Sequence, residues 1–223
     1  MRNAIKLPNN SVLTIDNAGC LGELIHDIVV CPNDVVAYFT TRTALFEQLC
    51  AGALPQAIAM ANFTGDHAWT DYERGIERAY AELNVPMPQL VGSTESNFEA
   101  TQSGLSLTMV GDVVFDVTQN CSHWYVVGVP LVGPQVLANL EKCAPLGWIY
   151  EQLKKGRIRY VHPVGSGGIR KECTRLFETE VLVELPMDVS GGPATAVIVG
   201  SNDASLTGFP FIHEIVFRNN FLY

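Results

Sequence analysis

The sequence predicts an α+β fold built from two small domains. Strand-like and helix-like segments follow one another without the strict alternation of a doubly wound sheet. The 223 residues are 48% hydrophobic and 17% charged, which supplies one large core or two small ones. A polar stretch, Thr118–Ser122, separates two groups of such segments. We therefore expect a division near residue 115, into domains 1–115 and 116–223.

The first half is expected to hold strands and two helices. The strands are the apolar or alternating segments Ser11–Asp16, which runs into a turn at Asn17-Ala18-Gly19, Ile28–Cys31, Ala57–Phe63, Leu90–Val91 and Leu105–Val110. The first expected helix, Val35–Ala51, has apolar residues at helical spacing and can be capped by Asn33 or Asp34. The second, Thr70–Leu83, begins with a capping box formed by Thr70 and Glu73.

The second half repeats the mixture. Its expected strands are Tyr125–Val129, Ile158–His162, Val181–Leu185, Ala196–Gly200 and Ile212–Phe217. Its expected helices are Gln135–Lys142, Trp148–Lys155 and Ile169–Phe177. The last helix follows the turn Gly165-Ser166-Gly167-Gly168, and a glycine turn that opens a helix is a physical anion site as well as an ordinary turn.

Composition excludes several classes of protein. A net charge of -9 argues against a nucleic-acid partner, because phosphate contacts need a basic face. The basic run Lys154–Arg159 is read either as a solvated helix end or as an anion contact. No apolar run has the length of a membrane span and no signal peptide is visible, so we expect a cytoplasmic protein. The six cysteines lack metal or disulfide spacing and are expected to be free, mostly buried thiols.

The familiar catalytic motifs are missing, including the Walker A loop, GxGxxG, HExxH and GxSxG. Three acids nevertheless stand where apolar segments do not need them: Asp16 at a strand end, Glu47 in an apolar helix and Glu95 after a turn. Carboxylates of this kind can hold magnesium against nucleotide phosphates. Ordinary structural roles also explain these residues: Asp16 as a capping residue, Glu47 as a solvent-facing residue and Glu95 as a turn residue.

Three strings resemble the aminoimidazole ribonucleotide synthetase superfamily, which includes thiamine-monophosphate kinase. They are Val36–Pro55, which is similar to a helix ending in D-xx-AxGAxP; Gly92–Gly104, which resembles a GSTExNxxTxQTG pattern; and His162–Ile169, which resembles an HD…GGL turn. The second string, together with Tyr125–Gly133, is similar to the small α-ribazole kinase-like branch of that superfamily. Leu24 stands where that branch tends to hold a lysine.

The resemblance implies a set of site residues. The implied metal ligands are Asp16, Glu47 and Glu95. The implied ATP and phosphate contacts are Asn17, Gly92, Ser93, Thr94, Asn97, Gly165, Ser166, Gly167 and Gly168. Asp66 and His162 are second-rank candidates, because the first ends a strand at the expected edge and the second abuts the glycine turn.

The resemblance also implies a function. It implies an N-terminal ATP- and metal-binding domain whose sheet pairs into a homodimer, and a C-terminal α/β sandwich. The activity it implies is a kinase that uses ATP and Mg²⁺ to phosphorylate a small molecule, such as the ribonucleoside α-ribazole in cobalamin salvage. Two alternatives stay open: a ring-closing enzyme like aminoimidazole ribonucleotide synthetase, and a nucleotide-binding or assembly protein without turnover.

Overall fold

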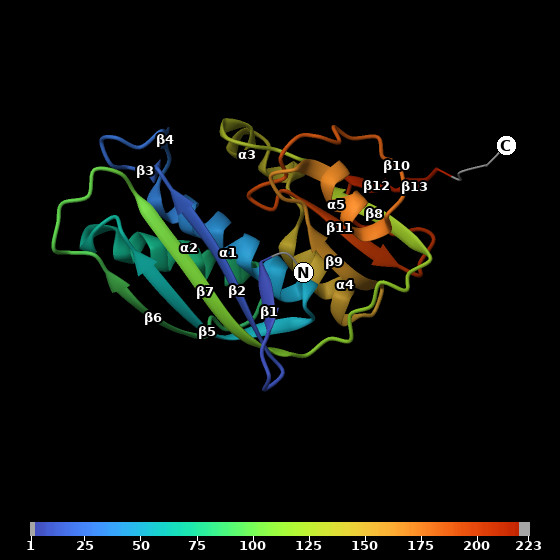
Figure 1. The fold of residues 1–223 in the computed structure, drawn as a ribbon, viewed down its shortest axis with the longest axis horizontal. Helices are drawn as coiled ribbons and strands as arrows, with labels where there is room; N and C mark the ends of the chain where they lie inside the picture. The colour runs from blue at the N-terminus through green and yellow to red at the C-terminus, as the bar shows by residue number, and fades with distance from the viewer. Residues whose placement is uncertain (1–2, 219–223) are drawn as a thin grey trace. The chain divides into compact units, whose positions relative to one another are not determined.

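The structure, a computed structural model, describes residues 3–218. The chain divides between Asp116 and Val117 into two compact units, which are described separately (Figure 1). Among residues 3–218, no helix combines the length and the apolar character that crossing a membrane demands. Cys50, Cys143 and Cys173 are buried and Cys20, Cys31 and Cys121 are half-buried, so half of the thiols are buried rather than most of them.

The first unit is a five-stranded sheet in the order β1-β2-β7-β5-β6. Its strands are β1 (Ala4–Lys6), β2 (Ser11–Gly19), β7 (Gly104–Val113), β5 (Ala53–Asn62) and β6 (Gln89–Thr94). Only β5 and β6 run parallel; the other neighbours are antiparallel. A short parallel pair, β3 (Leu21–Gly22) and β4 (Val29–Val30), lies in the loop after β2.

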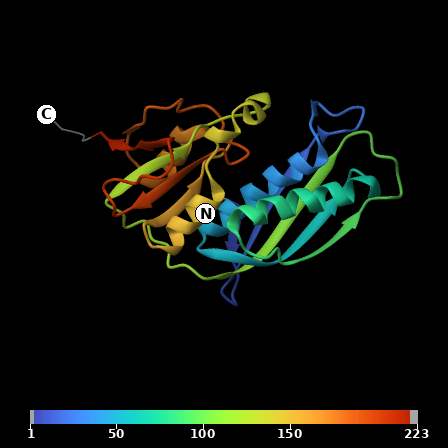
Figure 2. The same ribbon diagram turned by 180° about the vertical axis from the view of Figure 1, so that it is seen from behind.

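Two helices cover one face of this sheet, as Figure 2 shows. They are α1 (Asn33–Cys50) and α2 (Trp69–Leu83), the latter preceded by the single turn η1 (Asp66–Ala68). The fully buried Gln48 ties α1 to the sheet, since its Nε2 donates to the Val12 carbonyl and to Thr14 Oγ1. The buried sheet positions alternate along β7, with Leu105, Leu107 and Met109 toward the helices.

The second unit is built around a four-stranded antiparallel sheet in the order β12-β8-β11-β9. Its strands are β8 (His123–Gly128), β9 (Ile158–Pro163), β11 (Ala196–Ser201) and β12 (Ile212–Glu214), and β10 (Val181–Leu182) pairs with β13 (Val216–Phe217). Its helices are α3 (Pro134–Ala138), η2 (Leu140–Lys142), α4 (Leu146–Lys154) and α5 (Gly168–Phe177).

Several expected boundaries are wrong in an informative way. The strand that begins at Ser11 continues through the expected turn to Gly19, because β7 pairs with it residue by residue as far as Gly104. The Thr70–Glu73 capping box is not used, since α2 begins at Trp69 with Ala68 as its N-cap. Neither Asn33 nor Asp34 caps α1; Pro32 is the N-cap. Local signals placed these elements, and long-range pairing fixed their ends.

Candidate functional site

Four strand ends of the first unit meet at one edge of the sheet. The pairs Ala18↔Leu105, Asn62↔Leu105 and Asn62↔Thr94 place the ends of β2, β5 and β6 beside the start of β7. We call this edge, with the turns that leave it at residues 19–31, 63–66 and 95–103, the loop edge. Most of the site residues expected in the first unit lie on it or just behind it.

Strand alternation divides these residues between the two faces of the sheet. Asn17 and Ser93 occupy one row, through Ser106 and Ala61, on the face opposite the helices. Asp16 shares its face with Thr14, whose hydroxyl donates to the Ala44 carbonyl of α1, and so lies on the helix-covered face.

Asp16 is not at a strand end. It lies three residues inside β2, opposite Leu107 of β7, and is half-buried. The same row continues through Met60 to Gly92 of β6. Because neighbouring strands are about 4.8 Å apart, Asp16 and Gly92 are separated by about 14 Å. The backbone of Asp16 is therefore three strand spacings from β6.

Glu47 is fully buried in α1. The helix runs antiparallel to β2, since Gln48 contacts Val12 whereas Asn33, at the other helix end, lies beside Gly22. Glu47 is thus level with the start of β2, and the loop edge begins about 20 Å further along that strand. The third acid, Glu95, belongs to the loop edge, so Glu47 and Glu95 stand at opposite ends of the sheet.

Glu95 is exposed and organises its own turn. Its backbone N–H donates to the Asn62 carbonyl at 2.8 Å, which extends the β5–β6 pairing by one step. Its Oε1 accepts from the backbone N–H of Asn97 at 2.8 Å and from Asn97 Nδ2 at 3.0 Å. In this structure Glu95 therefore stabilises the turn that follows β6, which is the turn role considered for it above.

The three acids do not fit a single magnesium ion. A Mg²⁺ ion holds its ligands at about 2.1 Å, which requires carboxylates a few ångströms apart. Within residues 3–218, no group of three or more His, Cys, Asp or Glu side chains is arranged to hold a metal. The expected cluster of Asp16, Glu47 and Glu95 is therefore not assembled, because one acid projects from a strand, one from a helix and one from a distant turn.

Gly92 has a packing reason for being glycine. A Cβ on this residue would lie 2.5 Å from the Met60 carbonyl oxygen and 2.8 Å from the Trp69 ring. The ring occupies the space that a side chain would take.

Asp66 is exposed at the start of η1, and Asn62 Nδ2 donates to the Gly65 carbonyl beside it at 2.8 Å. The structure thus places Asp66 and Glu95 at the same edge, after neighbouring parallel strands.

In the second unit, His162 belongs to a buried cluster of polar contacts. Its Nε2 lies 2.9 Å from Glu172 Oε2, and the two side chains are 1% and 2% exposed. Arg175 Nη1 donates to the same carboxylate oxygen at 3.1 Å. The His162 ring stacks on Tyr160 with centroids 6.4 Å apart. These contacts give His162 a structural role in joining β9 to α5.

The glycine turn before α5 is partly occupied by protein carbonyls. The Gly168 N–H donates to the Gly165 carbonyl, and the Arg170 N–H donates to the Met187 carbonyl at 2.9 Å. A Cβ on Gly168 would lie 2.6 Å from the same Met187 oxygen. Ser166 at the tip of the turn is exposed. The Gly168 N–H, which was expected to help cradle a phosphate, is thus already donating within the protein, and so is the Arg170 N–H in the first turn of α5.

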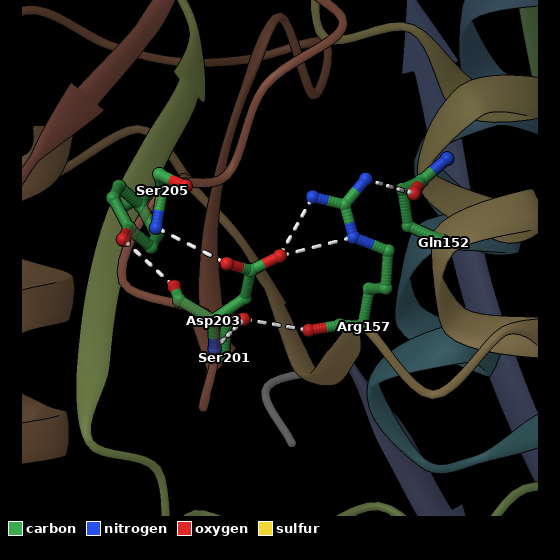
Figure 3. A network of polar contacts seen from close by, with 6 residues as sticks. Gln152, Arg157, Ser201, Asp203 and Ser205 are labelled. Carbon is green, nitrogen blue, oxygen red and sulfur yellow. Dashed lines mark hydrogen bonds and ion pairs between the residues drawn. The ribbon is translucent and has the colours of Figure 1, made fainter.

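Two of the four cations in the basic run, Lys154 and Arg157, are paired with carboxylates, as Figure 3 shows for Arg157. Its Nε and Nη2 donate to Asp203 Oδ2 at 3.1 and 2.7 Å, and its Nη1 donates to Gln152 at 3.3 Å. Lys154 pairs with Glu151 at 2.8 Å at the end of α4. For these two cations, the structure favours the paired helix end over an anion contact.

Sequence reasoning missed the most densely bonded acid of the loop edge, Asp27. Its carboxylate accepts from the Leu24 N–H at 2.8 Å, and from the N–H and hydroxyl of Ser103 at 2.7 Å each. Burial alone raises the pKa of Asp27, but these hydrogen bonds outweigh it and hold the pKa below its ordinary value. No local pattern marks Asp27, because its partner Ser103 is far away in sequence.

Comparison with known proteins identifies the fold. No protein-family model matches the sequence, and no curated protein matches it. Thiamine monophosphate kinase from Aquifex aeolicus superimposes with a TM-score of 0.67 at 12% identity, over 97% of this chain and 87% of the kinase. The structure of AaThiL complexed with AMPPCP and TMP gives 0.66 at 13% identity, over 96% and 82%.

A larger protein shares the fold in part of its length. Phosphoribosylformylglycinamidine synthase II from Thermotoga maritima superimposes with a TM-score of 0.57 at 17% identity, over 96% of this chain but 36% of the synthase. The expected fold class, mixed α+β and like that of aminoimidazole ribonucleotide synthetase, is therefore confirmed. At these identities the comparison establishes the fold.

Proposed function

We propose that this protein is an ATP-dependent kinase that phosphorylates a small molecule. The observation that carries the proposal is the similarity to a thiamine monophosphate kinase, which extends along nearly the whole of both chains. The second matching structure, AaThiL, is a complex with AMPPCP and TMP. A second protein of this fold, T. maritima PurL, was seen complexed with AMPPCP at a TM-score of 0.55. Both complexes contain an adenine nucleotide analogue.

The loop edge supports a nucleotide site of this kind. Asn17, Ser93 and Asn97 are exposed there, and Thr94 is half-buried beside them. Their amide and hydroxyl groups can donate to phosphate oxygens. Phosphoryl transfer depends on positioning and charge stabilisation more than on a protein nucleophile, so the absence of a catalytic motif is compatible with it.

The proposed acceptor is a ribonucleoside such as α-ribazole. Its support is the string Gly92–Gly104, which resembles the α-ribazole kinase-like pattern and forms the end of β6 and the following loop. This string occupies the loop edge, where an acceptor would have to meet the γ-phosphate.

One observation favours a second candidate, a nucleotide-binding protein without turnover. The described residues do not assemble Asp16, Glu47 and Glu95 into a metal site. A kinase needs its phosphate charges neutralised, usually by magnesium. A chain that binds ATP but lacks a complete metal site would keep the fold and the affinity for ATP, and would not transfer the phosphoryl group.

ATP consumption separates these candidates. The full chain is incubated with ATP and Mg²⁺ and with a panel of acceptors that includes α-ribazole and thiamine monophosphate, and ADP is quantified. Nucleotide binding is measured in parallel by calorimetry, with and without Mg²⁺. Acceptor-dependent ADP supports the kinase, and binding without ADP supports the second candidate. Absence of ATP binding at millimolar concentration, by a folded protein, contradicts both.

A charge placed at Ser93 should weaken ATP binding. Ser93→Asp puts a carboxylate among the expected phosphate contacts, and repulsion should lower the affinity at least tenfold, or about 1.4 kcal/mol. Gln89→Asp is the matched control, because Gln89 is exposed on the same face of β6 at its other end. Calorimetry should show near-normal affinity for the control. Equal losses in both variants would move the nucleotide away from the loop edge.

We also propose that the uncovered sheet face pairs with a second copy of the chain. Ile5, Ile15 and Val91 on this face are 63%, 44% and 62% exposed, and the small residues Ala57 and Ala59 lie between the larger ones. An isologous interface brings one patch against itself, which suits a surface with both large and small apolar side chains.

Light scattering tests this pairing. The wild type should have twice the chain mass of 24.3 kDa. An Ile15→Lys/Val91→Lys double variant should shift it to the monomer mass, since four like charges would face one another across the interface. Glu77→Lys, on the exposed side of α2, should leave the dimer intact. A monomeric wild type at micromolar concentration refutes the pairing.

A further inference from the structure

The first residue of α1 carries a buried oxygen that lacks a partner. Asn33 is 2% exposed, and among residues 3–218 its side-chain Oδ1 meets no hydrogen-bond donor. Its backbone N–H donates to Glu23 Oε2 at 3.3 Å. A buried acceptor left unsatisfied costs about 1–3 kcal/mol, so native proteins almost always provide a donor, a water or an ion for it.

This oxygen points toward the loop between β2 and α1. The position that a Cβ on Gly22 would take is 3.0 Å from Asn33 Oδ1 and 2.2 Å from Ser103 Oγ. The two oxygens are therefore at most about 5 Å apart, the largest separation of two ligands on one Ca²⁺ ion with bonds of about 2.5 Å. Asp27 Oδ2 lies 2.7 Å from the same Ser103 hydroxyl.

Four side chains thus bring oxygen atoms together at the start of α1. We call the group formed by Glu23, Asp27, Asn33 and Ser103 the oxygen cluster. Asn33 and Ser103 form its buried floor, whereas Glu23 is exposed and Asp27 half-buried.

The charge of the cluster selects a cation. Glu23 and Asp27 contribute two negative charges, against about half a positive charge from the helix end. The carboxylates therefore outweigh the helix dipole.

We propose that the oxygen cluster binds a hard divalent cation of the size of Ca²⁺. Carboxylate, amide and hydroxyl oxygens are the ligands such ions prefer, and Ca²⁺ tolerates an irregular ligand geometry, whereas Mg²⁺ demands a near-ideal octahedron. The ion fastens residues 20–31 to the start of α1 and to the start of β7. This site is independent of the proposed kinase activity and needs no nucleotide.

The test uses the full chain without nucleotide. Calorimetry with CaCl₂ should show one site, and the thermal midpoint should rise by about 5 °C or more when free Ca²⁺ is about 100 times its Kd. MgCl₂ should give a smaller rise, and NaCl at equal ionic strength should give none. A larger rise with Mg²⁺ than with Ca²⁺, or no calcium effect at all, overturns the proposal. A missing effect would mean that the Asn33 amide is turned, with its nitrogen donating to Ser103.

Two variants locate the site. Glu23→Gln keeps the size of an exposed side chain and should weaken calcium binding at least tenfold, with a near-normal midpoint in EDTA. Asp34→Asn is the matched control, because this adjacent acid lies outside the cluster and within 3.9 Å of Arg74; its affinity should stay within about threefold of the wild type. Ser103→Ala is the second variant and should also weaken binding. Equal affinities for all four proteins contradict the assignment. Ser93→Asp, which probes the nucleotide site, should leave the calcium affinity unchanged.

Discussion

Glu172→Ala is expected to destabilise the second unit by about 2–4 kcal/mol, because it leaves a buried hydrogen-bonding partner unsatisfied and a cavity beside it. Glu172 is 2% exposed; its Oε2 lies 2.9 Å from His162 Nε2 and accepts from Arg175 Nη1 at 3.1 Å. The alanine removes the carboxylate that both of these groups contact and leaves a cavity beside β9. Bulk water cannot take the place of the lost carboxylate at His162, because the His162 side chain is 1% exposed.

The measurement is urea denaturation read by hydrogen-exchange mass spectrometry, which reports on the two units separately. Glu172→Gln keeps the size of the side chain and one acceptor oxygen, so its loss of stability should be less than half that of Glu172→Ala. Lys171→Ala, an exposed neighbour on the same helix, should change stability by no more than about 0.5 kcal/mol. A loss in Glu172→Ala as small as that of Lys171→Ala would mean that the buried pair contributes little.

Gly75→Ala is expected to destabilise the first unit by about 3 kcal/mol. The added Cβ would lie 2.1 Å from the Asp34 carbonyl oxygen and 2.8 Å from both Ala37 Cβ and Tyr38 N, which belong to α1. Alanine is favoured over glycine inside a helix by about 1 kcal/mol. The clash is with backbone atoms that cannot rotate away, so overpacking outweighs the gain in helix propensity.

The matched control is Glu77→Ala, an exposed position two residues further along α2. It should leave stability nearly unchanged, because no atoms are forced together there. Gly75→Ala should also speed hydrogen exchange in α1 and α2 and leave α5 unaffected, whereas Glu172→Ala should do the reverse. A Gly75→Ala protein as stable as the wild type would show that the helices can separate without loss.

The candidate site was only partly predictable from sequence. Asp66 and Glu95 follow strands that turned out to be parallel neighbours, so reasoning from strand ends placed both at one edge. Asp27 and Ser103 were missed for the opposite reason. Their contact joins two loops distant in sequence, and neither loop carries a local pattern that announces the other.

By itself, the sequence determined the kinds and order of most elements. Alternation marked β7, helical spacing marked α1, and the absence of strict alternation between strands and helices indicated an α+β fold. These are local properties, because the period of apolar residues depends only on the conformation of the segment that carries them.

Tertiary structure alone decided which of the acids could meet. A strand period of two residues puts Asp16 on the helix-covered face, and the register with β7 and β5 sets it three strands from β6. The direction of α1 carries Glu47 to the far end of the sheet, where its surroundings bury it fully. Register and helix direction are set by packing between distant segments, and a spacing along the chain does not contain them.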